Sequence, residues 1–411
     1  MKLIVYEHVS GGGYADKPIP VSILSEGFSM LRTLVADFKA AGHSVSTVLD
    51  SRIAALNPPV EADYVASAFS FQEAKLIIHD ISASADAAYI VAPESNQVLQ
   101  SLVADIEQTG APSLNCRASA IGNASDKAAM LKRAKETGVP TPATVIVNAF
   151  DDVAEIEQDI CDSLGFPLIV KPVDGVGCAG LSVVQNVQQM GSAVTKVISE
   201  SSGNYFMIQE LIHGTAVSVS LLATDNGVLP VSLNKQDVTL MPPEANSTYN
   251  GGQVPFDSKL KSEAFAAAET AVKAFHGLRG YVGVDLVLTE KQPVVIEVNP
   301  RLTTSYIGLS KTAGFNPAQA IINAVFEHEL PANNQSRGYA VFSKVTTPKP
   351  ATEALQKTYS LGEVVSPPFP VSGNDTACAL ALSHGATLKE ATAEFHEALK
   401  RLRNIIRSEG H

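Results

Sequence analysis

The first 112 residues alternate strand-like and helical segments, and this alternation limits the folds that they can adopt. The apolar runs KLIVY, SVSTVL and AAYIVA are typical of buried strands. Between the first two runs, large apolar residues repeat at helical spacing, and Gly42 marks the end of that helix. Strands that alternate with helices form parallel sheets with the helices packed on them. We therefore expect an α/β domain at residues 1–112.

The following part of the chain, residues 113–330, has longer and more numerous strand-like runs and few helices. The runs are FPLIVKPV, LSVVQN, YFMIQELI, AVSVSLLAT, GVLPVSLN, YVGVDLVLT and PVVIEVNP. They predict a largely antiparallel sheet of α+β type. We expect Ser125 to cap the helix that precedes these strands. Residues 331–411 predict a small α+β extension that closes with an amphipathic helix.

The composition excludes several classes of protein. The chain has 411 residues, of which 45% are apolar and 18% charged, as in an ordinary globular protein of two or three domains. Its net charge of -12 disfavours nucleic-acid binding, because neutralising phosphates needs clustered Lys and Arg. The four cysteines form no CxxC pair, and no apolar run approaches the length of a membrane span. We expect a cytoplasmic protein that acts on small molecules, and leave a homodimer open.

The segment PVVIEVNPRLTTSYIG begins as an apolar strand and then places Glu297, Asn299 and Arg301 at alternate positions. Side chains two apart share one face of a strand, so these three would point the same way if the strand continued. Burying a carboxylate without a partner costs several kcal/mol. A neighbouring Arg or Lys, or a bound cation, is therefore expected beside them.

A second acid, Asp285, lies within the apolar run YVGVDLVL, twelve residues before Glu297. If the turn TEKQP joins the two strands in a hairpin, Asp285 lies beside the segment from Glu297 to Asn299. Oxygen ligands of this kind suit Mg²⁺. The alternative is a structural cluster of salt bridges between Asp, Arg and Glu.

The stretch IVKPVDGVGCAG places Lys171 at the end of an apolar strand, before Gly175, Gly177 and Gly180. Backbone amides exposed by glycines approach phosphate oxygens closely, and the lysine supplies a positive charge. The alternative is a glycine hairpin with a surface lysine. We expect Cys178 in this loop to be a small lid residue and not a nucleophile, since no histidine partner is evident.

Five short motifs follow one another over residues 120–310. They are Lys127 in ASDKAAMLKRAKETGVPTP, Lys171 in LIVKPVDGVGCAG, Glu210 in MIQELIHG, Asp285 in GVDLVL, and IEVNPR. In this order they resemble the ATP-grasp superfamily of carboxylate-amine ligases. The resemblance implies an ATP-grasp fold with a Rossmann-like pre-ATP-grasp domain before it. It also implies ATP-dependent amide formation through an acyl phosphate, with release of ADP and phosphate.

The resemblance implies a role for each of these residues. It assigns the ATP phosphates to Lys127 and Lys171 under the loop of Gly175, Gly177 and Gly180, the adenine to Glu210, Leu211 and Ile212, Mg²⁺ (or Mn²⁺) to Asp285, Glu297 and Asn299, and catalysis to Lys171 and Arg301. One position departs from the pattern. Many members carry a glutamate for the ribose hydroxyls where this chain has Ala216.

Within the superfamily, the segments YEHVSGG, SEGFSMLRTLVADF, VAPESNQVL, LNKQDV and YNGGQVP are similar to tyramine-glutamate ligases of methanofuran-type cofactor synthesis. This similarity suggests an amino acid such as glutamate and an amine such as tyramine as substrates. Two other functions stay open. One is an ATP-grasp ligase for another amino acid or a dipeptide, and the other is a non-catalytic nucleotide-binding module.

Substrate contacts are expected where strands of a parallel sheet end, and in two further segments. The residues are Glu7, Glu94, Lys235, Asn250, Gly251 and Gly252. A carboxylate there would suit the ammonium of an amino acid or of an amine. The alternative for each is a solvated loop residue.

Overall fold

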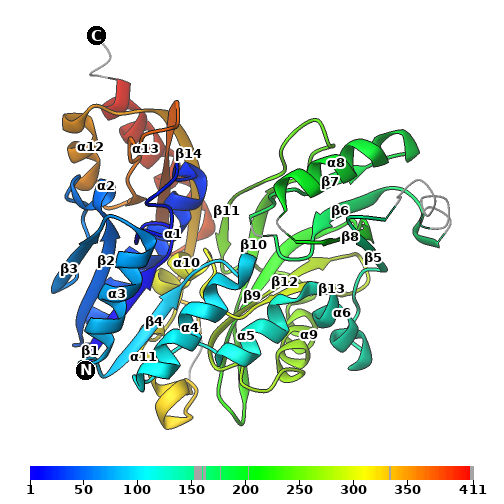
Figure 1. Cartoon of the computed structure of the whole chain (residues 1–411), viewed down its shortest axis with the longest axis horizontal. Coiled ribbons are helices and arrows are strands. Elements are labelled where there is room, and N and C mark those ends of the chain that lie inside the picture. Colours follow the sequence, from blue (N-terminus) through cyan, green and yellow to red (C-terminus); the bar gives the residue numbers. More distant parts are fainter. Residues whose placement is uncertain (152–159, 161–162, 176, 202, 333–334, 408–411) are drawn as a thin grey trace.

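The computed structural model describes residues 1–151, 160, 163–175, 177–201, 203–332 and 335–407. It contains three sheets, which Figure 1 shows together with the helices that cover them. No helix among these residues is both long and apolar enough to cross a bilayer.

The first sheet is parallel, as the sequence predicts, with the order β3-β2-β1-β4. Its strands are β1 (Lys2–Glu7), β2 (Ser44–Asp50), β3 (Tyr64–Ala68) and β4 (Ala87–Val91). The helices and turns of this region are α1 (Val21–Ala40), α2 (Ser51–Ala54), α3 (Phe71–Ser82), η1 (Ser95–Gln97) and α4 (Val98–Thr109). α1 buries its apolar face and ends before Gly42, whose φ of +84° is a left-handed conformation that favours glycine.

Two helices, α5 (Ala118–Ser125) and α6 (Lys127–Glu136), lead to the second sheet. The side chain of Asp126, and not that of Ser125, caps α6 by accepting the backbone N–H groups of Ala128 and Ala129. The expected cap was therefore wrong by one residue. Asp at this position has the same capping ability as Ser.

The second sheet has the order β5-β8-β6-β7 and is antiparallel throughout. Its elements are β5 (Thr144–Asn148), β6 (Leu168–Pro172), β7 (Ser182–Val184), η2 (Val187–Gln189), α8 (Met190–Glu200) and β8 (Tyr205–Glu210). α8 covers one face, where Ala193 and Val197 pack with Phe206. The sequence predicted one antiparallel sheet in residues 113–330, whereas the structure divides these strands between two sheets.

The third sheet has eight antiparallel strands in the order β13-β12-β9-β10-β11-β14-β16-β15. The strands are β9 (Thr215–Ala223), β10 (Val228–Thr239), β11 (Thr248–Val254), β12 (Gly280–Leu288), β13 (Pro293–Asn299), β14 (Tyr339–Pro348), β15 (Val364–Ser366) and β16 (Thr376–Gly385). The remaining helical elements are α9 (Lys261–Lys273), α10 (Tyr306–Thr312), α11 (Pro317–Ile322), η3 (Asn323–Glu327), α12 (Thr352–Tyr359) and α13 (Leu388–Arg407).

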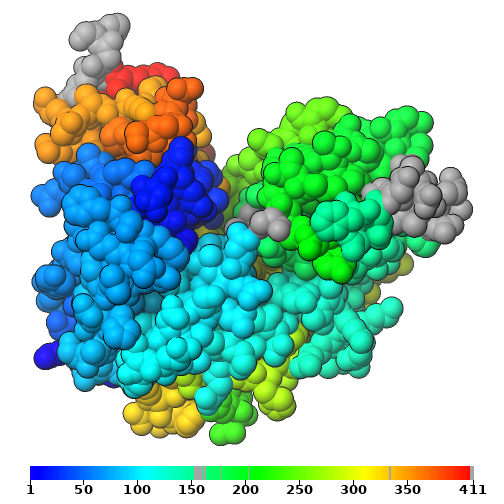
Figure 2. Space-filling model, viewed as in Figure 1, coloured from blue at the N-terminus to red at the C-terminus, as the bar shows by residue number. Residues whose placement is uncertain are grey.

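The strands after residue 330 continue this third sheet, because β14 pairs with β11. The segment expected as a separate extension at residues 331–411 therefore has no sheet of its own. α1 also packs against β16, and Leu34 of α1 shares a hydrophobic cluster with Phe342 and Leu380. Figure 2 shows a deep hollow between this joint body of the first and last segments and the part that carries the second sheet.

Candidate active site

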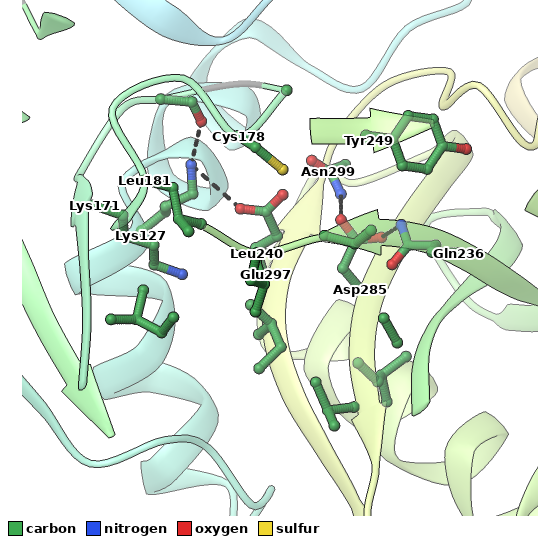
Figure 3. Close-up of a pocket in the computed structure, with 18 of the residues that line it drawn as sticks. Lys127, Lys171, Cys178, Leu181, Gln236, Leu240, Tyr249, Asp285, Glu297 and Asn299 are labelled. Carbon is green, nitrogen blue, oxygen red and sulfur yellow. Dashed lines mark hydrogen bonds and ion pairs between the residues drawn. The ribbon is translucent and has the colours of Figure 1, made fainter. Parts of the chain in front are cut away.

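A cavity lies where the second and third sheets meet, and it collects most of the polar residues that the sequence singled out. On one side are β6, β8 and the loop after β6, and on the other are β10, β12 and β13. Figure 3 shows the lysines and the carboxylates facing one another across it. Glu297, Asn299 and Arg301 all line the cavity, although β13 ends at Asn299.

The β12–β13 hairpin confirms the predicted pairing, since Asp285 lies directly opposite Glu297 in the ladder. Both oxygens of Asp285 accept hydrogen bonds, one from Gln236 Nε2 at 3.0 Å and one from Asn299 Nδ2 at 3.1 Å. Burial, together with repulsion from Glu297, raises the pKa of Asp285. Two adjacent buried carboxylates of this kind call for further positive charge.

Two lysines supply part of that charge. Lys127 Nζ lies 3.2 Å from Glu297 Oε2 and donates a hydrogen bond to the carbonyl oxygen of Gly175 at 2.5 Å. Burial lowers the pKa of Lys171 to about 8, although Glu297 opposes that shift. Burial alone would raise the pKa of Glu297, but attraction from the two lysines outweighs it and holds the pKa below its usual range.

Arg301 forms an ion pair with Glu94, with 2.7 Å between Nε and Oε2. The side chains are 17% and 8% exposed, so both charges are largely withdrawn from water. Glu94 follows β4 of the parallel sheet, so this pair connects the first sheet to the cavity. Sequence reasoning offered Glu94 as a substrate contact, and the structure places it against Arg301.

One end of the cavity is apolar and lies between β8 and β12. Leu211, Ile212, Ala216, Ile169 and Val287 line it, as the expected adenine segment requires. Glu210 also lines the cavity, and its Oε1 accepts the N–H of Ala143. The position of the missing ribose glutamate, Ala216, thus forms part of an apolar wall.

The glycine loop borders the cavity through Gly175, Gly177 and Cys178. Gly180 does not line it, because its N–H is directed to Glu200 Oε2 at 2.7 Å. Burial raises the pKa of the Cys178 thiol to about 11, which favours the neutral thiol over a nucleophilic thiolate. Residue 176 of the expected lid DGVGCAG lies outside the described residues.

Several predicted substrate residues lie away from the cavity lining. The carboxylate of Glu7 accepts the N–H groups of Val9 and Ser10 and the Ser10 hydroxyl, so it folds its own loop. A side chain on Gly27 would overlap that carboxylate at 2.5 Å, which shows how closely α1 packs on it. Glu7 is thus a buried structural residue.

The other substrate predictions fail because of strand geometry. Gln236, Val238 and Leu240 of β10 face the cavity, and therefore Lys235 faces away and is exposed. Asn250, Gly251 and Gly252 belong to β11 and do not line the cavity either. A Cβ on Gly251 would lie 2.1 Å from the carbonyl oxygen of Phe342, so this glycine permits the close approach of β14.

Four cavity residues had no assigned role from the sequence. They are Gln236, Glu26, Tyr249 and Thr304. Gln236 and Glu26 stand in the segments LNKQDV and SEGFSML, which carried a resemblance but no chemistry. Only the tertiary packing shows that these elements meet.

The donor set for a metal contains two carboxylates and one amide, from Asp285, Glu297 and Asn299. Among the described residues, no group of three or more His, Cys, Asp or Glu could hold a metal ion. A hard cation at this place would therefore need oxygen atoms from a ligand as well. Mg²⁺ is commonly bound in that way.

Comparison with known proteins agrees with this geometry. Residues 124–305 match the ATP-grasp domain, and residues 43–121 match the pre ATP-grasp 3 domain. Tyramine--L-glutamate ligase of Methanocaldococcus fervens is 26% identical over 341 residues, which cover 82% of this chain and 99% of that protein. Tyramine--L-glutamate ligase of Methanocaldococcus jannaschii is 28% identical, with 80% and 90% covered.

A solved structure shows the same fold. The putative ATP-grasp superfamily protein from Archaeoglobus fulgidus superimposes with a TM-score of 0.62 at 22% identity, covering 93% of this chain and 99% of that one. The fold thus agrees over nearly the whole chain, including strands that neither domain match contains. The chain belongs to the ATP-grasp superfamily, with an ATP-grasp domain preceded by a parallel-sheet pre-ATP-grasp domain.

Proposed function

We propose that this protein is an ATP-dependent ligase that joins an amino-acid carboxylate to an amine through an acyl phosphate. L-Glutamate and tyramine are the first substrates to test, because two relatives that match over most of the chain are named for them. The observation that carries the proposal is the meeting of two lysines, two acids and an arginine in one cavity. These are Lys127, Lys171, Asp285, Glu297 and Arg301.

The nucleotide fits this cavity with its base in the apolar end and its phosphates toward the lysines. Lys127 and Lys171 approach the same carboxylate, that of Glu297, from the side of the glycine loop. Two ammonium groups so placed would attract the phosphate chain. Gly175 and Gly177 leave room for the chain to pass close to the backbone.

A divalent cation, Mg²⁺ or alternatively Mn²⁺, fits the donor oxygens of Asp285, Glu297 and Asn299. The raised pKa of Asp285 reflects two carboxylates in contact, and a cation would relieve their repulsion. Gln236 holds Asp285 in place by its hydrogen bond. When bound, such a cation would neutralise phosphate charge.

The chemistry needs an activated carboxyl group, because hydroxide is a poor leaving group. A carboxylate oxygen attacks the γ-phosphorus of ATP, the bond to the β-phosphate oxygen breaks, and ADP leaves. The amine nitrogen then attacks the carbonyl carbon, phosphate leaves with the C–O electron pair, and the nitrogen loses a proton. Lys171 and Arg301 would neutralise the charge that moves in these steps, so catalysis is mainly positioning and electrostatics.

The decisive experiment measures ADP release with amino acids crossed against amines, including L-glutamate with tyramine. Release that requires both partners, with an amide detected by mass spectrometry, supports the ligase. Release with a different pair would support a ligase for another amino acid or dipeptide. Tight ATP binding without turnover in any mixture would support a nucleotide-binding module. Glu290→Gln, at an exposed turn residue, is the matched control for the inactive variant Glu297→Gln.

A further inference from the structure

The cavity has a second polar region, made by segments that neither domain match includes in full. Glu26 of α1 lines the cavity together with Tyr249 of β11 and Thr304 of the loop after β13. We call Glu26, Tyr249 and Thr304 the polar end. Figure 3 shows Tyr249 on the far side of Asp285 and Asn299 from the two lysines, so the polar end lies beyond the proposed metal-phosphate region.

Glu26 is held by two contacts that leave it able to accept more. Its Oε1 lies 2.7 Å from Lys344 Nζ of β14, and its Oε2 accepts the Thr304 hydroxyl at 2.9 Å. An ionised carboxylate has about four lone-pair sites. With its side chain 16% exposed and lining the cavity, Glu26 can still accept hydrogen bonds from a ligand.

Lys344 has spare donor capacity as well. Its ammonium donates to Glu26 Oε1 and to Ser22 Oγ at 2.8 Å, and its side chain is 13% exposed. Within the part of the chain that the structure describes, these hydrogen bonds use two of its three N–H groups. The nitrogen also lies 5.6 Å from the centre of the Tyr249 ring. Lys344 therefore reaches the cavity wall from the strand next to β11.

A purely structural tie between α1 and β14 explains this ion pair poorly. Partly buried ion pairs gain little over apolar pairs, since both charges lose water. Here the pair faces a cavity and presents a negative and a positive group side by side. That arrangement is complementary to a small zwitterion, whose ammonium and carboxylate are also adjacent.

We propose that Glu26 and Lys344 bind the α-ammonium and the α-carboxylate of the amino-acid substrate. The subsite takes α-amino acids with a second, side-chain carboxylate that extends toward Arg301 and is the group activated. This inference rests on the proposed ligase function for the identity of its ligand. It assigns the choice of substrate to α1 and β14, on either side of the matched domains in the chain.

The test uses three ligands on the full-length protein with ADP and Mg²⁺ present. L-Glutamate carries all three groups, glutarate lacks the ammonium, and 4-aminobutyrate lacks the α-carboxylate. Calorimetry should show that the wild type binds L-glutamate at least about tenfold more tightly than either analogue, the loss expected for one charge-assisted hydrogen bond. Glu26→Gln should abolish the preference over glutarate alone, and Lys344→Met the preference over 4-aminobutyrate alone.

This crossed pattern separates binding from a structural role. Glu363→Gln breaks an ion pair of the same length, to Arg401, outside the cavity lining, and should leave all three affinities unchanged. If Glu26→Gln and Lys344→Met weaken all three ligands equally, or none, the inference is overturned. Urea unfolding of each variant shows whether an equal loss comes from a damaged fold.

The outcomes also distinguish this inference from the proposed function. ADP release that depends on L-glutamate, with an unchanged KM in both variants, would overturn the subsite and leave the ligase standing. Selective L-glutamate binding with the crossed pattern, but no ADP release with any amine, would support the subsite and count against the ligase. A wild type that does not bind L-glutamate overturns the inference.

Discussion

Replacing Arg301 tests whether this side chain acts on the reaction or only balances nearby acids. Its ion pair with Glu94 is 2.7 Å long, and the two side chains are 17% and 8% exposed. Removing one partner of a buried pair leaves the other charge uncompensated, which costs about 3–5 kcal/mol. Because both groups keep some contact with water, we expect about 3 kcal/mol of lost unfolding free energy for Arg301→Ala.

The comparison with Glu94→Gln makes this prediction specific. Both variants break the same pair, so urea unfolding should show a similar loss of stability. Only Arg301→Ala removes the cation that would neutralise charge during phosphoryl transfer. A lost donor of this kind costs about 2.7–4 kcal/mol, roughly a hundred- to a thousandfold in kcat. Glu94→Gln should lower kcat by less than about tenfold, because the cation stays.

The assay is ADP release at saturating ATP and amino acid, with kcat and the KM for ATP determined separately. A loss of transition-state stabilisation appears in kcat with little change in that KM. Arg301→Lys should rescue only partly, since an ammonium lacks the planar pair of donors. An unchanged kcat in Arg301→Ala, with lower stability, would refute the catalytic role and leave a structural counter-ion.

Three further predictions concern the cavity and the loop after β1. Glu297→Gln should abolish Mg²⁺-dependent turnover while the far-UV circular dichroism stays unchanged, and near-normal activity would remove Glu297 from the site. Lys171→Ala should raise the KM for ATP strongly and Cys178→Ser should change little, whereas an inactive but stable Cys178→Ser would reopen covalent catalysis. Burial lowers the pKa of His8 to about 4, so the folded state holds it neutral while the unfolded state takes up a proton below the ordinary histidine pKa of about 6.5. Unfolding free energy should therefore fall by up to about 3 kcal/mol between about pH 6.5 and 4, and urea titrations should show a shallower pH dependence for His8→Leu.

Features encoded by neighbouring residues could be predicted from the sequence. The apolar repeat of α1 gave its buried face, and the alternation of strands and helices gave the parallel sheet. The pairing of Asp285 with Glu297 followed from two apolar strands and a short turn. Each of these depends on contacts between residues that are close in the chain.

The rest depended on register and on contacts between distant segments. Lys235 and Gln236 are adjacent, and a strand sends adjacent side chains to opposite faces, so an error of one position selects the wrong residue. The strand pattern also did not reveal that β5–β8 form a sheet apart from β9–β13. Nothing in the spacing of Glu26 and Lys344 shows that α1 and β14 meet, because they are separated by most of the chain.

The pairing of β11 with β14 has a consequence for the synthesis of the protein. Ribosomes deliver residues in order, at about 5–20 per second, and β14 follows every element of the matched ATP-grasp domain. Until β14 emerges, β11 has an unpaired edge that other chains could join, and Glu26 lacks its counter-ion. A nascent chain can thus complete the region for nucleotide before the region for amino acid, and it gains selectivity only with its last strands.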